Sequence, residues 1–192
     1  MRNYLVAVGA ALALGACGTT PPEAFYTLNP VAPPRPAAAH AGARFTVVVG
    51  PVRVPEMVDR PQLVVRRSAN RVDVLEQHRW AQPLQAEIAR VLAEDLGSRL
   101  PAARAVPAFA YAGSQADYRV TLDIEQFDAV PGQGVTVQAL WSVRQAGEAP
   151  RSGRSTVREA AQAAGYEALA AAYARALARI SDDIAAALPG QP

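Results

Sequence analysis

Two neighbouring segments in the middle of the chain show alternation of apolar residues with mostly polar ones. The first reads DYRVTLDIEQF over residues 117–127, and after the turn sequence PGQG the second continues as VTVQALWSV over residues 135–143. Because successive side chains of a strand point to opposite faces, each segment presents one apolar and one polar face. The pattern predicts an antiparallel hairpin whose apolar face must be covered by another layer.

Other segments supply more strands. RFTVVVGPVRVP, residues 44–55, is a nearly continuous β-branched run of the kind buried on both faces, with Pro51 ending its first half. QLVVRR and RVDVLEQ flank the short connection SAN and predict a second hairpin. RSTVREA, residues 154–160, adds one more strand, and FYTL, residues 25–28, is β-prone and could add a first one.

Two segments have helical periodicity. Pro83 stands at the first turn of the first helix, and Gly97 and Pro101 mark its end. The second helix runs from about Tyr166 to Leu188, and Pro189 stops it. Apolar residues recur every three or four positions in both. The order of elements predicts an α+β fold, a mainly antiparallel or mixed sheet with two amphipathic helices packed on one face.

The only cysteine, Cys17, follows an apolar run at the N-terminus. Arg2, the apolar stretch 4–14 and the small residues before Cys17 are typical of a secretory signal, and the run is too short to span a bilayer. Leu-Gly-Ala-Cys resembles the lipobox of bacterial lipoproteins, which implies cleavage after residue 16 and a fatty-acylated Cys17. The residue after the cysteine is Gly18, whereas lipoproteins retained in the inner membrane commonly have Asp at this position. This difference implies an anchor on the periplasmic face of the outer membrane. The alternative is an ordinary signal peptide with an incidental cysteine.

Residues 17–43 are rich in proline and alanine and predict an extended tether, followed by a single domain over residues 44–190. The formal charge is +2, and Arg2 leaves with the signal. This near-neutral balance argues against a nucleic-acid-binding protein, which usually carries a basic excess on one face.

No pattern of catalytic or metal-binding residues is present. His40 lies in the tether and His78 at the end of a predicted strand, with no local nucleophile motif beside it. GQG at residues 132–134 lacks the strand-to-helix setting of a phosphate-binding loop. Asp182 and Asp183 are interpreted as a solvated pair on the last helix. We therefore expect no enzyme activity, no metal and no cofactor other than the covalent lipid at Cys17.

Several motifs follow one another in a characteristic order: FYTL soon after the cysteine, then VVVGPVRVP, VPEMVDRPQLVVR and HRWAQPL, and finally the closing helix. In this order they resemble the ABC-type transport auxiliary lipoprotein (PqiC-like) family. The resemblance implies an outer-membrane lipoprotein that serves an MCE-type lipid transport system and supports envelope integrity. Its partners would be an MCE-domain protein and inner-membrane transport components, with homo-oligomers also conceivable.

Within that resemblance, Asp59, Arg60 and Pro61 precede a hairpin strand, and Arg79 and Trp80 precede the first helix. Asp59, Arg60, Arg79 and Trp80 are candidate partner contacts, since Trp and Arg are enriched at interface hot spots. The structural alternative places Trp80 in the core and pairs Arg60 with an acidic residue. Two alternative functions stay open: a lipid-carrying module, and an envelope lipoprotein unrelated to transport.

Overall fold

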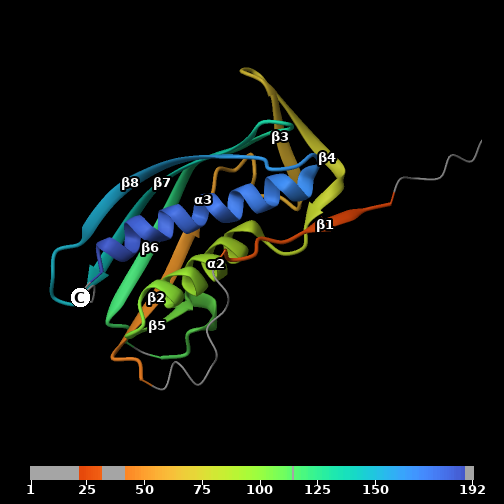
Figure 1. Cartoon of the computed structure of the whole chain (residues 1–192). Helices are drawn as coiled ribbons and strands as arrows, with labels where there is room; N and C mark the ends of the chain where they lie inside the picture. Colours follow the sequence, from red (N-terminus) through yellow and green to blue (C-terminus); the bar gives the residue numbers. More distant parts are fainter. Residues whose placement is uncertain (1–21, 32–41, 114, 189–192) are drawn as a thin grey trace, which may run out of the picture.

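The computed structural model describes residues 22–31, 42–113 and 115–188, which form two sheets and two long helices (Figure 1). Cys17, His40 and Pro189 lie outside these residues. The smaller sheet has the order β1-β4-β3 and the larger one β5-β2-β6-β7-β8. In chain order the elements are β1 (Ala24–Tyr26), β2 (Phe45–Arg53), β3 (Gln62–Ser68), β4 (Arg71–Trp80), α2 (Leu84–Arg99), β5 (Ala103–Pro107), the 3-10 turn η2 (Ala108–Ala110), β6 (Tyr118–Val130), β7 (Gly134–Gln145), β8 (Arg151–Ala160) and α3 (Tyr166–Ala186).

The predicted central hairpin is the antiparallel pair β6 and β7, with Tyr118 opposite Gln145 and Val130 opposite Gly134. The apolar positions of its first half face the core, as the alternation predicts. The register shifts between Ile124 and Gln126, and from Phe127 onward the odd-numbered residues are the buried ones. A bulge of this kind inserts one residue and exchanges the two faces of a strand. The core therefore receives apolar side chains along the whole of β6.

β2 is buried on both faces at Val47–Val49, as predicted, and pairs in parallel with both β5 and β6. Its register against β6 shifts between Val49 and Val52, around Pro51. Gly50 has a φ of 130°, a backbone conformation that glycine adopts readily. Pro51 interrupts the ladder with β6, but the strand continues to Arg53.

The hairpin β3–β4 forms a sheet of its own with β1, in addition to the sheet built around β6 and β7. The FYTL prediction is confirmed in part, because Ala24–Tyr26 pairs in parallel with His78–Trp80. Arg66 of β3 forms an ion pair of 2.9 Å with Asp128 of β6, which joins the two sheets. β5 pairs with β2 at the edge of the larger sheet, and no alternation in the sequence predicted it.

Both helices lie on the same side of the larger sheet (Figure 1). α2 packs on β2 and β5, α3 packs on β7 and β8, and the two helices contact each other. The ring of Tyr173 on α3 stacks on Phe127 of β6 with centroids 3.8 Å apart, so the interior between sheet and helix is filled. Among the described residues, neither helix has the length and apolar character needed to cross a bilayer.

The limits of α2 differ from the prediction at both ends. Pro83 is the residue before the helix, and Gly97 lies inside the last turn, where it is buried. A Cβ on Gly97 would stand 4.0 Å from the Cβ of Ala105 on β5, so there is room for one. The helix ends at Arg99 because its backbone leaves the helical region at Leu100, just before Pro101.

Candidate functional site

The loop before β3 and the junction between β4 and α2 come together around Trp80. The Trp80 amide donates to the Pro61 carbonyl at 2.7 Å, and the Gln85 side-chain amide donates to the Asp59 carboxylate at 2.9 Å. Val58, 4% exposed, is buried under the same loop. These contacts hold two segments that are about 20 residues apart in sequence in one fixed arrangement.

A pocket of about 330 Å³ opens between the two segments. Its lining includes Asp59, Arg60 and Trp80, three of the four residues predicted as partner contacts, with Pro61 and Pro83 beside them. The side chains of Asp59 and Arg60 are exposed at its rim. Prolines keep the backbone around the pocket rigid, since their φ angle is fixed. The site is therefore a shallow, preformed surface pocket with a cation and an anion at its edge.

Trp80 belongs mainly to the core. Only 6% of its surface is exposed, and its ring lies 6.2 Å from that of Tyr173. This is the packing role that the structural alternative assigned to it. Only a small part of the indole surface remains for a partner, so a contact at this pocket would depend chiefly on the exposed Arg60 and Asp59.

Arg79 lies outside the pocket lining. Its guanidinium pairs with Glu23 at 3.5 Å and donates to the Glu76 carbonyl at 3.2 Å. Neighbouring residues of a strand point to opposite faces, which separates Arg79 from Trp80. Arg79 thus contributes to holding β1 against β4.

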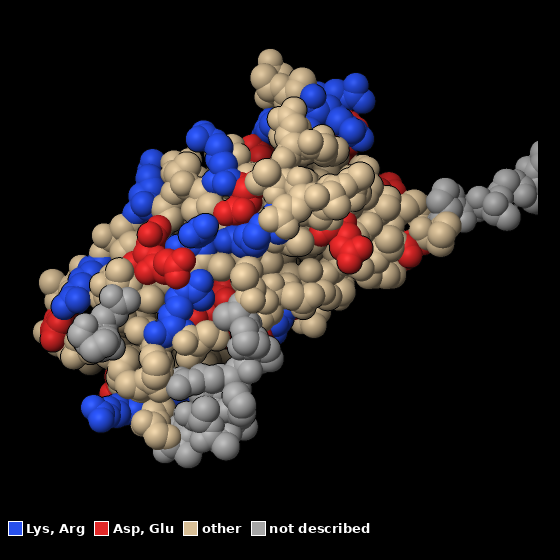
Figure 2. Space-filling model, in the orientation of Figure 1, with Lys and Arg blue, Asp and Glu red and all other residues tan. Residues whose placement is uncertain are grey.

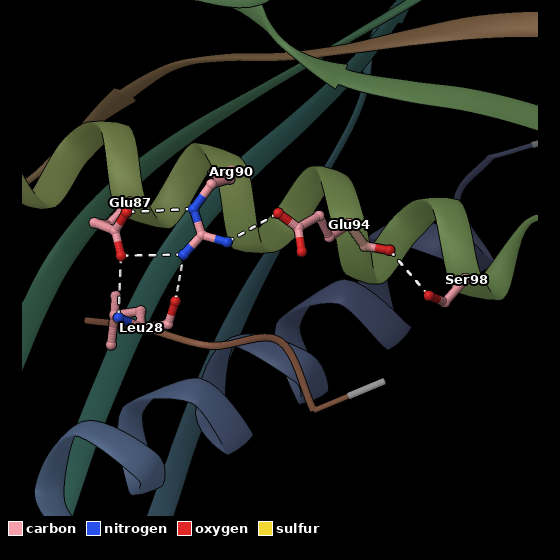
Figure 3. Close-up of polar contacts among 5 residues, drawn as sticks. All are labelled: Leu28, Glu87, Arg90, Glu94 and Ser98. Carbon is pink, nitrogen blue, oxygen red and sulfur yellow. Dashed lines mark hydrogen bonds and ion pairs between the residues drawn. The ribbon is translucent and has the colours of Figure 1, made fainter. Parts of the chain in front are cut away.

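The segment after β1 is fixed to α2 by a charged cluster that the sequence did not reveal (Figure 3). The Leu28 amide donates to Glu87 at 3.1 Å, and the Leu28 carbonyl accepts from Arg90. Arg90 also pairs with Glu87 at 3.1 Å and with Glu94 at 2.8 Å. Both backbone groups of a fully buried residue are satisfied in this way, so the segment is locked to the helix.

Glu87 is 1% exposed, and a carboxylate so buried must be paired. Its hydrogen bond with Arg90 raises the pKa of the guanidinium, against the opposing effect of burial. The spacing of Glu87, Arg90 and Glu94 along one helix face was readable in the sequence. Their contact with Leu28, about 60 positions away, was not.

The other polar residues singled out in the sequence that the structure describes, His78, Asp182 and Asp183, have structural partners. His78 accepts or donates a hydrogen bond with the Tyr26 hydroxyl at 2.8 Å and lies 4.3 Å from the Tyr166 ring. Asp182 pairs with Arg99, and Asp183 accepts from Ser155. Within the described ranges, no group of three or more His, Cys, Asp or Glu side chains is placed to hold a metal ion.

Comparisons with known proteins give a consistent picture. The model of the family described as "ABC-type transport auxiliary lipoprotein component" matches residues 26–185, which is most of the chain. A crystal structure titled only as an uncharacterized protein superposes with a TM-score of 0.71 at 20% identity, covering 86% of this chain and 98% of the other. The crystal structure of XCC0632 from Xanthomonas campestris gives 0.63 at 18% identity, covering 84% and 92%. No curated protein matches.

Proposed function

Since the chain belongs to the family of ABC-type transport auxiliary lipoprotein components, we propose that it is a non-catalytic adaptor of an MCE/ABC-type system that moves phospholipid between membranes. In this proposal an acylated Cys17 anchors the chain to the periplasmic face of the outer membrane. The domain would contact an MCE-domain protein and inner-membrane transport components, and other copies of itself, and so support envelope integrity.

The observation that carries this proposal is the family match, which extends from β1 to the last turn of α3. The fold supports an adaptor in a second way. The space between sheet and α3 is occupied by the stacked Phe127 and Tyr173, so an acyl chain between these layers would displace well-packed side chains. Recognition at the surface, by side chains on a rigid frame, needs no such displacement.

The pocket around Arg60 is the proposed partner contact. Arginine at the rim of a pocket can form paired hydrogen bonds with a carboxylate, and it is enriched among residues that dominate binding energy. Asp59, held by Gln85, adds an acceptor next to it. A partner with an acidic side chain and an apolar contact for the proline-lined wall would match this arrangement.

The test uses the full-length lipoprotein and its membrane partners. Arg60→Ala is expected to fold normally, because the side chain is exposed, and to weaken co-purification and cross-linking with the MCE protein. Arg104→Ala, another exposed arginine, on β5, is the matched control. Trp80→Ala removes core packing and is expected to unfold the domain in circular dichroism, so it cannot report on binding. Normal partner binding by a folded Arg60→Ala variant would refute the contact.

The lipid-carrying alternative rests on a different feature, a surface groove of about 590 Å³ between α3 and the segment that follows β1. Phe25 and Val31, both more than half exposed, contribute to its lining together with Ala170, Ala171 and Ala174. Native mass spectrometry after gentle extraction distinguishes the two functions, since a stoichiometric phospholipid on the protein would favour the carrier.

A further inference from the structure

The end of the β3–β4 hairpin is a basic surface that projects from the rest of the molecule (Figure 1). It carries Arg66, Arg67 and Arg71, and Asp73 is the one carboxylate among residues 66–73. Blue side chains gather at this end in Figure 2. We name these four residues and the connection between them the hairpin tip.

The contacts within the hairpin tip leave positive charge facing solvent. Arg66 is engaged with Asp128 of β6, which fixes the hairpin on the larger sheet. Arg67 and Arg71 both pair with Asp73, at 2.7 and 3.3 Å, and their side chains are 43% and 72% exposed. One carboxylate between two guanidinium groups neutralises only half of their charge. Exposed donors therefore remain for an anionic ligand.

The length of chain between them limits how far the acylated cysteine can lie from the hairpin tip. β1 pairs in parallel with the last three residues of β4, with Ala24 beside His78, and β4 bends between this pair and the hairpin tip (Figure 1). Seven residue steps separate Cys17 from Ala24, a reach of at most about 25 Å. Seven steps along β4 separate His78 from Arg71, about 24 Å at the rise of a strand. The cysteine can thus reach the level of the hairpin tip.

We propose that the hairpin tip is the membrane-facing end of the protein and that Arg67 and Arg71 bind the anionic phospholipid headgroups of the leaflet that holds the Cys17 lipid. This inference rests on the proposed lipid anchor. Basic side chains close to an anionic bilayer are attracted to it, and guanidinium groups match phosphate in geometry. The Cys17 lipid, which precedes β1, and the charge of the hairpin tip would then hold the domain on the membrane at two points and so orient it. The far end of the larger sheet, with the β7–β8 turn, then points away from the membrane.

The test places a fluorescent dye at either end of the lipidated, full-length protein in vesicles. Because an acylated Cys17 has no free thiol, Asn70→Cys at the hairpin tip and Ala149→Cys in the β7–β8 turn each provide the only labelling site. In vesicles of phosphatidylcholine with phosphatidylglycerol, a headgroup quencher should reach the dye at residue 70 and not at residue 149. In vesicles of phosphatidylcholine alone, or at high salt, the difference should be strongly reduced.

Charge variants complete the test. Arg67→Gln with Arg71→Gln should lower the ratio of docked to free hairpin by about 5-fold for each arginine. Arg154→Gln with Arg179→Gln is the matched control, because these arginines are 54% and 70% exposed and also paired with glutamates. Equal quenching at residues 70 and 149 in a vesicle-bound, lipidated chain, or equal effects of the two double variants, would overturn the inference and leave the anchor intact. A reactive thiol at Cys17 would overturn both.

Discussion

The charged cluster that locks the N-terminal segment to α2 makes a sharp prediction for stability. Glu87→Ala removes the acceptor for the Leu28 amide and for two hydrogen bonds from Arg90, at 3.1 and 3.2 Å. Breaking a buried ion pair from one side costs about 3–5 kcal/mol, because the remaining charge is left uncompensated. Arg90 is 30% exposed and keeps Glu94, which reduces the cost. We therefore expect a loss of about 2–3 kcal/mol in the free energy of unfolding.

Glu94→Ala is the matched control, since it removes the other carboxylate bound to the same guanidinium. Glu94 is 33% exposed and Glu87 only 1%, so its loss should cost less than about 1 kcal/mol. Thermal unfolding followed by circular dichroism should show a decrease of about 4–12 °C in Tm for Glu87→Ala. Chymotrypsin should cut faster after Tyr26 in this variant, because the following segment is released. Equal shifts for the two variants would refute the reasoning that burial decides the effect.

Three further predictions concern the core and the sheet. Burial, with a smaller contribution from Asp128, raises the pKa of Tyr173 well above 10.0. The free energy of unfolding should therefore be retained below pH 10 and fall as the pH rises further. In unfolding measured as a function of pH, the Tyr173→Phe variant should lose less stability over this alkaline range. Gly97→Ala should stabilise α2 by about 0.5–1 kcal/mol in urea unfolding, because its Cβ fits beside Ala105, and a destabilised variant would contradict this. Gly153→Ala should destabilise by more than about 2 kcal/mol, because its Cβ would stand 2.2 Å from the Trp141 ring, and unchanged unfolding would show that the ring can move.

Local patterns in the sequence were sufficient for most of the fold. Alternation predicted β6 and β7, a β-branched run predicted the doubly buried β2, and helical spacing predicted α2 and α3. The division into two sheets was not predictable from these patterns, because it depends on which strands pair across long distances. Strand β5 was missed for a related reason: its sequence ARAVP has little alternation, and it forms by parallel pairing with β2.

For the candidate site too, the sequence indicated some of the residues and missed others. The resemblance to the auxiliary lipoprotein family, with the enrichment of Trp and Arg at interfaces, indicated Asp59, Arg60 and Trp80, and the fold brings these three to one pocket. Arg79 is adjacent to Trp80 in sequence, yet the alternation of a strand turns it to the other face, where it pairs with Glu23. The interface role of all four residues stays a prediction. Leu28, Glu87 and Arg90 were missed because their contact depends on the path of the N-terminal segment over α2.

The path of that segment relates the proposed anchor to the proposed partner contact. Tyr26 pairs with Trp80, and its carbonyl accepts from the Ala81 amide at 2.8 Å. Leu28 is then bound by Glu87 and Arg90 on the first turns of α2. The chain that leads back to Cys17 is therefore attached to the same β4–α2 junction that forms the pocket. A force on the lipid anchor would reach this junction through backbone hydrogen bonds and a buried ion pair before it reached the larger sheet. An adaptor that holds a partner against a membrane needs this short connection, because a pocket carried on a loosely attached domain could not resist the partner's movement.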